Sequence, residues 1–381
     1  MPPQLELALT AVAFIGHFSI AVWLFNRLHA VALPRRAIKV LEKLLLLAAA
    51  GVLVIGCFCL GQAYIVWQAY LVICLLAAAA VVPCWLIPKL REPAPAALLS
   101  NDTSFVDVTQ RLGFRPLHGV ETHVLSRIPG NQLLEIAVQR KTLKLPSLPK
   151  QLDGVTIAHL SDLHMTGQLG QEFYDCVVDE TNALKPDLIV ITGDILEKER
   201  CLPWIKPTLG RLQARHGKYF ILGNHETRLA DVAPLRRTLV EAGLTDLGSR
   251  CEILSMRSTE FLIAGTELPW FGTTPDIAPE TPHSALRTPL FRILLSHSPD
   301  QFPWAKAHGF DLMLAGHNHG GQIRLPYLGA LITPSWYGFR YAGGLYFESL
   351  TLLHVSRGLS GVHPIRLNCP PELALLVLTT G

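Results

Sequence analysis

The uncharged segment at residues 44–87 limits the possible folds of this chain more than any other feature. It reads LLLLAAAGVLVIGCFCLGQAYIVWQAYLVICLLAAAAVVPCWLI. A helix needs about 20 apolar residues to cross a bilayer, so the segment is long enough for two crossings. It divides near Gly61, where aromatic residues flank the division as they do at membrane surfaces. The pattern therefore predicts two membrane-spanning helices, near 44–62 and 67–87.

A third apolar segment lies upstream at residues 7–25 and is interrupted only by His17, which we expect to face neighbouring helices. A cleaved secretory signal would require basic residues before the apolar segment, and none is present here. We therefore expect the segment to remain as a third span. The alternative, an apolar helix inside a soluble core, is less favoured beside two further apolar segments. Residues 1–92 are thus expected to form a membrane anchor of about three spans.

Basic residues orient this anchor. The loop after the first span carries Arg27, Arg35, Arg36, Lys39 and Lys43, whereas the next loop has none. Positively charged loops stay in the cytoplasm, so three spans place the remainder of the chain on the cytoplasmic side of a cell membrane. The net charge of +3 is small and dispersed, which argues against nucleic acid as a partner. The eight cysteines include no C-x-x-C pair, so neither a disulfide framework nor a thiolate metal site is indicated.

The rest of the chain reads as a linker followed by an α/β domain. Residues 93–130 begin within a proline-rich stretch, PKLREPAPAALLSNDTS from Pro88, and are expected to be a juxtamembrane linker. Residues 133–145 alternate apolar and polar side chains, which is typical of an edge strand or hairpin arm. Six short apolar runs then recur (VTIAHL, DLIVIT, KYFIL, FLIAG, RILLS and DLMLA), separated by helical patterns at 171–184 and 228–242. Such continuous hydrophobicity predicts strands that are covered on both faces, in a domain at 131–381.

Polar residues follow five of these runs at the point where each strand should end. They are Asp162 and His164, then Gly193 and Asp194, then Gly223, Asn224, His225 and Glu226, then His297, and finally Gly316, His317 and His319. Ligands of open α/β sheets bind at the carboxyl ends of strands, so we expect five loops from one sheet edge to converge. Other histidines, namely His159, His216, His283, His308 and His354, are expected to be solvated or hydrogen-bonded surface groups.

The converging side chains offer carboxylate oxygens, imidazole nitrogens and one amide oxygen. This mixture suits Mn, Fe, Zn or Mg rather than Cu(I) or an iron–sulfur cluster. There are too many ligands for one ion, and two adjacent cations need a bridging carboxylate, for which Asp194 is the natural candidate. The glycines let the backbone turn tightly and bring the ligands together.

The ordered set D-x-H, G-D, G-N-H-E, a single histidine and G-H-x-H resembles the calcineurin-like metallophosphoesterase superfamily. The resemblance covers residues 152–381 and implies a sandwich of two mixed β-sheets flanked by helices. It implies one metal ion held by Asp162, His164, Asp194 and His319, and another held by Asp194, Asn224, His297 and His317. His225 matches the family histidine that faces the substrate, and Glu226 stands where many members have aspartate, which leaves the support of His225 open.

Two longer stretches, GHNHGGQIRLP and VSRGLSGVHPIRLNCPPEL, resemble a bacterial membrane-associated branch that includes UDP-2,3-diacylglucosamine pyrophosphatases of lipid A synthesis. That resemblance implies a bacterial inner-membrane enzyme with two divalent ions, Mn being the first choice. Such an enzyme would use a metal-activated hydroxide, with His225 protonating the leaving oxygen. Among four downstream arginines, Arg324 and Arg357 are the preferred candidates to clamp a pyrophosphate, although each could equally be a solvated surface charge.

Three functions remain open from the sequence. The first is a membrane-tethered hydrolase of a lipid-linked phosphodiester or pyrophosphate, with UDP-2,3-diacylglucosamine as the leading substrate. The second is a hydrolase of a soluble phosphoester or phosphoprotein, for which the anchor only sets the location. The third is a non-catalytic, metal-stabilised scaffold, which would have no physical need for Asn224 or His225.

Overall fold

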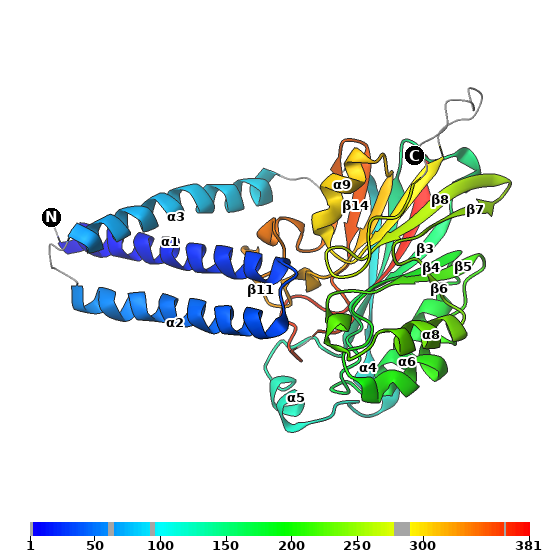
Figure 1. Cartoon of the computed structure of the whole chain (residues 1–381), viewed down its shortest axis with the longest axis horizontal. Coiled ribbons are helices and arrows are strands. Elements are labelled where there is room, and N and C mark those ends of the chain that lie inside the picture. The colour runs from blue at the N-terminus through cyan, green and yellow to red at the C-terminus, as the bar shows by residue number, and fades with distance from the viewer. Residues whose placement is uncertain (1–2, 60–64, 92–95, 278–289, 362) are drawn as a thin grey trace. The chain divides into compact units, whose positions relative to one another are not determined.

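The computed structural model describes residues 3–59, 65–91, 96–277, 290–361 and 363–381, and its elements are labelled in Figure 1. The chain divides into two compact units. The first comprises Met1–Pro93 together with Leu331–Phe339, and the second comprises Ala94–Ala330 together with Arg340–Gly381. A short piece from late in the sequence therefore belongs to the N-terminal unit, which the sequence did not predict.

Three long helices build most of the first unit: α1 (Pro3–Ala30), α2 (Arg35–Cys59) and α3 (Ile65–Arg91). Among the described residues, one stretch, Ala8–Ala30 in α1, is long and apolar enough to cross a bilayer. The apolar stretch in α3, Trp67–Val81, is shorter than the one in α1. The first turns of α2 contain several basic residues. The structure thus supports one apolar span near the N-terminus instead of three. The expected span at 44–62 also runs into residues 60–64, which lie outside the described residues.

Helices α1 and α3 pack closely against each other. A Cβ at Gly16 would clash with the backbone of Cys74, so only glycine permits this approach. One residue later, His17 is buried and hydrogen-bonds the Tyr70 hydroxyl. His17 therefore faces a neighbouring helix, as expected.

Asn26, near the end of α1, holds the late segment 331–339. Its side chain is 2% exposed. The Nδ2 group donates to the Leu331 carbonyl at 3.1 Å, and Oδ1 accepts from the Thr333 N–H at 3.0 Å. One amide thus satisfies a backbone acceptor 305 positions away along the chain and a backbone donor 307 positions away.

The larger sheet of the second unit has the strand order β1-β2-β15-β3-β4-β5-β6. Its strands are β1 (Leu98–Asp107), β2 (Glu135–Lys144), β3 (Thr156–Leu160), β4 (Leu188–Thr192), β5 (Gly217–Ile221), β6 (Thr245–Asp246) and β15 (Glu372–Thr379). Strands β3 to β6 run parallel, whereas β15 is antiparallel to β3 and parallel to β2. All five residues of β4 are buried, as its continuous apolar sequence predicted.

The smaller sheet has the order β13-β14-β10-β9-β8-β7. Its strands are β7 (Cys251–Met256), β8 (Thr259–Thr266), β9 (Phe291–Ser296), β10 (Leu312–Ala315), β13 (Gly344–Glu348) and β14 (Thr351–Val355), and a separate ribbon pairs β11 (Arg324–Leu325) with β12 (Gly329–Ala330). Strands β8, β9, β10 and β14 are parallel, and β7 and β13 are antiparallel at the two edges.

Apolar side chains of the two sheets meet in the central core, where Ile157 and Val190 lie with Leu295 and Leu314. Helices cover the outer faces (Figure 1): α6 (Gln171–Ala183) and α8 (Ala233–Glu241) pack on the larger sheet, and α9 (Phe302–Ala307) on the smaller. The remaining helices are α4 (Val108–Leu112), α5 (Val120–Leu125) and α7 (Ile205–Leu209). Two mixed sheets flanked by helices are therefore confirmed.

Two expectations about this unit need correction. The linker expected over 93–130 holds β1, α4 and α5, which belong to the second unit. Strand β2, which was expected at an edge, lies inside the sheet, and β1 occupies the edge position. Strand β15 lies inside the larger sheet, where its backbone pairs with both β2 and β3.

Candidate metal centre

The polar residues at the strand ends do converge, but they come from two sheets instead of one. Asp162 and His164 follow β3, Asp194 follows β4, and Asn224 and His225 follow β5, all in the larger sheet; His297 follows β9, and His317 and His319 follow β10, in the smaller sheet. The carboxyl ends of parallel strands from both layers of the sandwich therefore face a common site.

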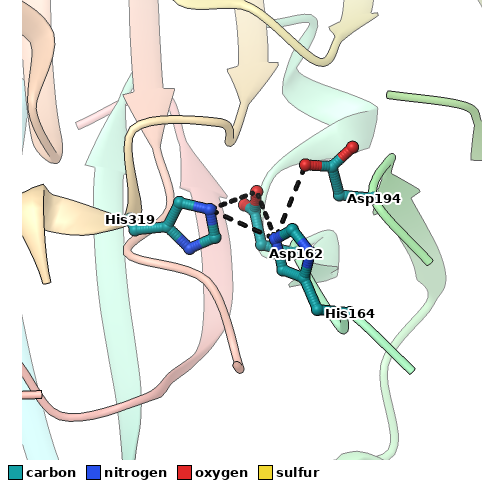
Figure 2. A group of neighbouring side chains, drawn as sticks. All are labelled: Asp162, His164, Asp194 and His319. Atoms are coloured by element: carbon teal, nitrogen blue, oxygen red, sulfur yellow. Dashed lines mark hydrogen bonds and ion pairs between the residues drawn. The ribbon is translucent and has the colours of Figure 1, made fainter. Parts of the chain in front are cut away.

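Figure 2 shows the first group, formed by Asp162, His164, Asp194 and His319. The His164 Nε2 atom lies 3.5 Å from Asp194 Oδ2 and 3.2 Å from His319 Nε2. His319 Nε2 is also 3.5 Å from Asp162 Oδ1. All four residues are buried, and their potential ligand atoms lie within 4.8 Å of one another.

The second group contains Asp194 again, with His297 and His317. His297 Nε2 lies 3.2 Å from Asp194 Oδ2 and 3.2 Å from His317 Nδ1. The Asn224 Oδ1 atom adds an amide oxygen 3.1 Å from His297 Nε2. The structure thus brings together all seven expected ligands in two groups, and Asp194 is common to both.

The donor atoms in these groups fit divalent metal ions. Asp194 Oδ2 and His317 Nε2 are buried and make no hydrogen bond, which is costly unless another partner is bound. The Nδ1 atom of His297 lies 2.7 Å from the Thr192 carbonyl, and that of His319 lies 3.2 Å from the Ser360 carbonyl. Such bonds fix the tautomer and leave each Nε2 as a metal ligand. The two groups could therefore hold a dinuclear centre, with Asp194 shared between the ions.

Backbone strain supports a functional role for this site. Five expected ligands have positive φ angles: Asp162 (54°), His164 (44°), Asp194 (51°), His317 (71°) and His319 (51°). Non-glycine residues rarely adopt this conformation, and such strain concentrates at functional sites. Space is equally limited, because a Cβ at Gly316 would collide with Ser161 and Asp162. The tight turn aims these side chains inward at the expense of local stability.

The site requires positive charge. Burial alone would raise the pKa of Asp194, but His297, His225 and His164 outweigh it and hold that pKa well below its usual range. Burial alone would likewise lower the pKa of His297, but the Asp194 carboxylate outweighs it and raises this pKa to about 9. The carboxylates therefore favour cations at this position, a demand that divalent metal ions would meet.

Glu226 supports the loop that carries Asp194. Its carboxylate accepts hydrogen bonds from the backbone N–H groups of Asp194 (3.2 Å), Ile195 (2.6 Å), Leu196 (3.0 Å) and Gly223 (2.7 Å). The open question about glutamate at this position is thereby answered. Glu226 orients the loop of the shared ligand and makes no hydrogen bond to the His225 ring among the described contacts.

Glu197 is the site residue that sequence analysis missed. Its Oε1 atom lies 2.8 Å from His225 Nδ1 and also pairs with Arg228, and its Oε2 atom lies 3.5 Å from His164 Nδ1. Arg228 Nη2 lies 3.0 Å from the other ring nitrogen of His225. Glu197 thus contacts both His164, an expected metal ligand, and His225, the histidine that is expected to face the substrate. The available signal was an acid three residues after Asp194, on the same loop.

The two arginines preferred as substrate ligands have other contacts. Arg324 donates to the Gly320 carbonyl at 3.1 Å, one residue beyond His319. Arg357 Nε donates to the buried Glu372 carboxylate at 3.0 Å, and its Nη2 atom is buried without a hydrogen bond. Their role in substrate binding stays a prediction.

A second group of buried titratable residues lies between the sheets, and we call it the inter-sheet cluster: Lys141, His159, His354 and Glu372. Lys141 Nζ lies 2.5 Å from Glu372 Oε1 and 2.9 Å from His354 Nε2. The two histidines meet at 2.9 Å through their Nδ1 atoms, and His159 Nε2 bonds the Thr192 hydroxyl at 2.8 Å. His159 and His354 are fully buried, so the expectation that they lie on the surface is wrong. His216 and His308 are exposed, and His283 lies outside the described residues.

Comparison with known proteins agrees with this geometry. Residues 155–321 match the family model described as calcineurin-like phosphoesterase. The chain is 34% identical over 248 residues to the uncharacterized metallophosphoesterase YkuE of Bacillus subtilis, covering 64% of this chain and 85% of that protein. It is 29% identical over 226 residues to the phosphodiesterase YaeI of Escherichia coli, covering 58% and 81%.

The narrower resemblance is weaker. The UDP-2,3-diacylglucosamine pyrophosphatase LpxG of Chlamydia trachomatis is 26% identical over 291 residues, covering 63% of this chain and 88% of that protein. It is thus one branch among several that the chain resembles. The metal-binding residues are intact, and the chain belongs to the calcineurin-like phosphoesterase family as a metal-dependent phosphoric ester hydrolase.

Proposed function

We propose that this protein hydrolyses a phosphodiester or pyrophosphate bond in a lipid-linked substrate, with UDP-2,3-diacylglucosamine as the best specific candidate. The observation that carries the reaction class is Asp194, a buried carboxylate shared by two groups of ligand atoms. One shared carboxylate between two cation sites is the arrangement expected of a two-metal hydrolase. Mn is the first choice of ion, with Fe, Zn and Mg as alternatives that the same oxygen and nitrogen donors accept.

Divalent ions bound at the two groups would activate a water molecule and neutralise charge on the phosphoryl oxygens. Beside these two groups, His225 is the residue that we assign to protonate the leaving oxygen. Its backbone N–H donates to Asp194 Oδ1 at 2.8 Å, so its position is tied to the shared ligand. Burial lowers the pKa of His225. Glu197 holds its Nδ1 atom and Arg228 contacts its Nε2 atom, so the ring is oriented to act together with that guanidinium on the leaving oxygen.

Arg228 complements this role. Its guanidinium contacts both His225 Nε2 and Glu197, so a positive charge stands where negative charge would develop on the leaving group. A non-catalytic scaffold would not need this set of contacts. They therefore support a hydrolase over the scaffold alternative.

Exposed apolar residues support a membrane location and a lipid-linked substrate. In α2, Leu47 is 69% and Ile55 is 58% exposed, and in α3, Leu76 is 65% exposed. Such surfaces are unusual in water and typical of contact with lipid. We therefore propose that the N-terminal unit lies at a membrane through α1, with the catalytic unit on the cytoplasmic side. A tethered enzyme would meet acyl chains without extracting them, which would cost about 0.8 kcal/mol per methylene.

The test is a substrate panel on the full chain in detergent, with each metal ion in turn. We expect release of UMP from UDP-2,3-diacylglucosamine, and hydrolysis of bis-p-nitrophenyl phosphate as a general activity. His225→Ala should lower kcat about 100- to 10,000-fold without loss of metal. His216→Ala, at an exposed histidine, is the matched control and should behave as the wild type. Absence of any metal-dependent phosphoester hydrolysis by the wild type would contradict the reaction class.

A soluble phosphoester is the second candidate substrate, and the similarity to the phosphodiesterase YaeI favours keeping it. It predicts that kcat/KM for a water-soluble substrate exceeds that for every lipid-linked one, in detergent and in liposomes alike. Sidedness has its own measurement. A reporter fused after Gly381 should be active only in the cytoplasm.

A further inference from the structure

A pocket of about 500 Å³ lies beside the loops that carry the metal ligands. Its lining includes His118, Gln168, Arg200 and Trp204, and the one acidic side chain among the described residues that line it is Glu121 in α5. The volume is in the range of sites for small organic molecules. None of these residues was singled out by the sequence analysis, and none belongs to the two ligand groups.

Two loops lead directly from the metal centre to this pocket. The loop after β3 and the loop after β4 run side by side, because Met165 N donates to the Ile195 carbonyl and Glu197 N donates back to the Met165 carbonyl, at 3.0 and 3.3 Å. Arg200 follows Glu197 by three residues, so the two Cα atoms are at most about 10 Å apart. The pocket therefore lies within the length of a small substrate from the site where Glu197 contacts His225.

The outer wall of the pocket is fixed to the same loops. The His118 N–H donates to the Gln168 carbonyl at 2.8 Å, and the Gly170 N–H donates to the Pro116 carbonyl at 2.8 Å. Leu117 and Leu169 form an antiparallel bridge at the same place. Backbone hydrogen bonds thus hold both walls in position, which favours a pocket that exists before any ligand arrives.

Arg200 is held at the inner wall by a specific local structure. Its Nη2 group donates to the Thr166 carbonyl at 2.8 Å. Gly167 has a φ of +80°, and a Cβ there would lie 2.9 Å from that same Nη2 atom. Glycine at this position therefore makes room for the guanidinium. Since a guanidinium has five N–H donors, one bond to a carbonyl leaves others for an anionic ligand.

From this arrangement we propose that the pocket binds the leaving half of the substrate, a planar ring that carries an anionic group of its own, as in a nucleoside monophosphate. The inference rests on the proposed function and specifies its substrate class. Arg200 would bind the phosphate, and Trp204 would stack on the ring. The leaving side is assigned because the pocket continues the loop of Glu197, which orients His225. An acyl chain is a poor fit, since its entry would desolvate Arg200 and Gln168 without replacing their hydrogen bonds.

The test measures ligand binding by equilibrium dialysis on the full chain in detergent with Mn, so that it does not depend on turnover. The probes are UMP and inorganic phosphate. We expect Arg200→Gln to weaken UMP binding about 10-fold or more while phosphate binding stays unchanged, because phosphate alone occupies the metal centre. Trp204→Leu should also weaken UMP binding selectively. Lys198→Gln is the matched control, since Lys198 is an exposed cation on the same loop that does not line the pocket.

Two results would overturn the proposal. One is an Arg200→Gln protein that binds both probes as the wild type does, and the other is an equal loss of both, which would indicate a structural role. Gly167→Ala provides a second variant that displaces the guanidinium without removing its charge. Because Gly167 has a φ of +80°, its metal content and thermal unfolding are checked first, and with both unchanged it should reproduce the selective loss. If the wild type binds UMP in this manner but hydrolyses no phosphoester, the proposed function fails while the pocket assignment stands.

Discussion

The metal centre and the inter-sheet cluster contain the same kinds of buried side chains, yet they differ in how those side chains are satisfied. In the inter-sheet cluster, every buried side-chain nitrogen and oxygen of Lys141, His159, His354 and Glu372 has a partner, among the residues that the structure describes. In the metal centre, Asp194 Oδ2, His317 Nε2 and His164 Nδ1 make no hydrogen bond, although acidic or imidazole groups lie 3.2–3.5 Å from the first and the last of these atoms. The backbone differs too, because positive φ angles occur at five metal-centre ligands and at no member of the inter-sheet cluster.

This difference teaches how to separate a site from a structural network. Burial of histidine and carboxylate side chains is common to both regions and therefore identifies neither. Unsatisfied ligand atoms on a strained backbone indicate a group that awaits a ligand. A complete hydrogen-bond network on regular strands indicates one that stabilises the fold. Four measurements can break or sharpen this distinction.

The largest effect is expected for Asp194→Asn. Both ligand groups lose their common carboxylate, so the metal content should fall at two sites, and kcat/KM should drop roughly 10⁴-fold or more. Elemental analysis and kinetics on bis-p-nitrophenyl phosphate provide the measurement. Glu372→Gln in the inter-sheet cluster is the comparison and should keep its metal stoichiometry. Equal loss of metal in both variants would contradict the distinction between the metal centre and the inter-sheet cluster.

Lys141→Met should destabilise the fold without touching the chemistry. It leaves the buried Glu372 carboxylate without its 2.5 Å partner, and breaking a buried ion pair costs about 3–5 kcal/mol. We expect a lower free energy of unfolding and unchanged metal content in the folded fraction. The double variant Lys141→Met/Glu372→Gln should recover part of the loss, because the buried carboxylate, which keeps only Arg357 as a cationic partner in Lys141→Met, is then neutral. A double variant no better than Lys141→Met alone would argue against the pairing.

Glu197→Gln tests whether a residue near the metal centre supports catalysis or binds metal. As a group that orients His225, its loss should lower kcat about 10- to 100-fold, with KM and metal content unchanged. Glu199→Gln, two residues away and exposed, is the control. A fall in metal content would instead show that Glu197 is a ligand, since it lies with His164 and His225 in a third group of close donor atoms.

The smallest effect concerns acid stability. Burial lowers the pKa of His159 well below its usual value and that of His354 to about 4. Because the unfolded chain binds these protons more readily, stability should fall as the pH drops from about 6.5 towards 4. This loss should be the same with and without EDTA, and it should shrink in His354→Leu. Acid destabilisation that disappears when metal is supplied would assign it to the metal centre.

The sequence predicted the convergence of the candidate metal ligands because these residues obey a local rule. Each ligand follows an apolar strand within a few residues, and the carboxyl ends of parallel strands must meet at an edge. Glu197 escaped because it lies further along a loop, where only the fold brings it back to His225. His159 and His354 were misjudged because they lie within strands, and a strand residue is buried or exposed according to what covers its face.

Long-range pairing was beyond local patterns for the same reason. The sequence of β15 predicts a strand, but nothing in it specifies that β2 and β3 are its neighbours. The proline-rich stretch before β1 suggested a linker, yet β1 pairs with β2 along its length and becomes part of the sheet. The pocket beside Arg200 likewise depends on a bridge between Leu117 and Leu169, which are distant in sequence.

The amide of Asn26 bears on how this protein should be shortened for biochemistry. Deleting the apolar N-terminal helices is the usual first step towards a soluble enzyme. Here the deletion would also remove the hydrogen-bond partners of the Leu331 carbonyl and the Thr333 N–H. The trimmed chain would then carry a frayed insertion between two otherwise folded stretches, and any drop in turnover could be mistaken for a need for membrane. Asn26→Ala in the intact chain separates these causes, since it removes both hydrogen bonds to this segment and keeps the helices.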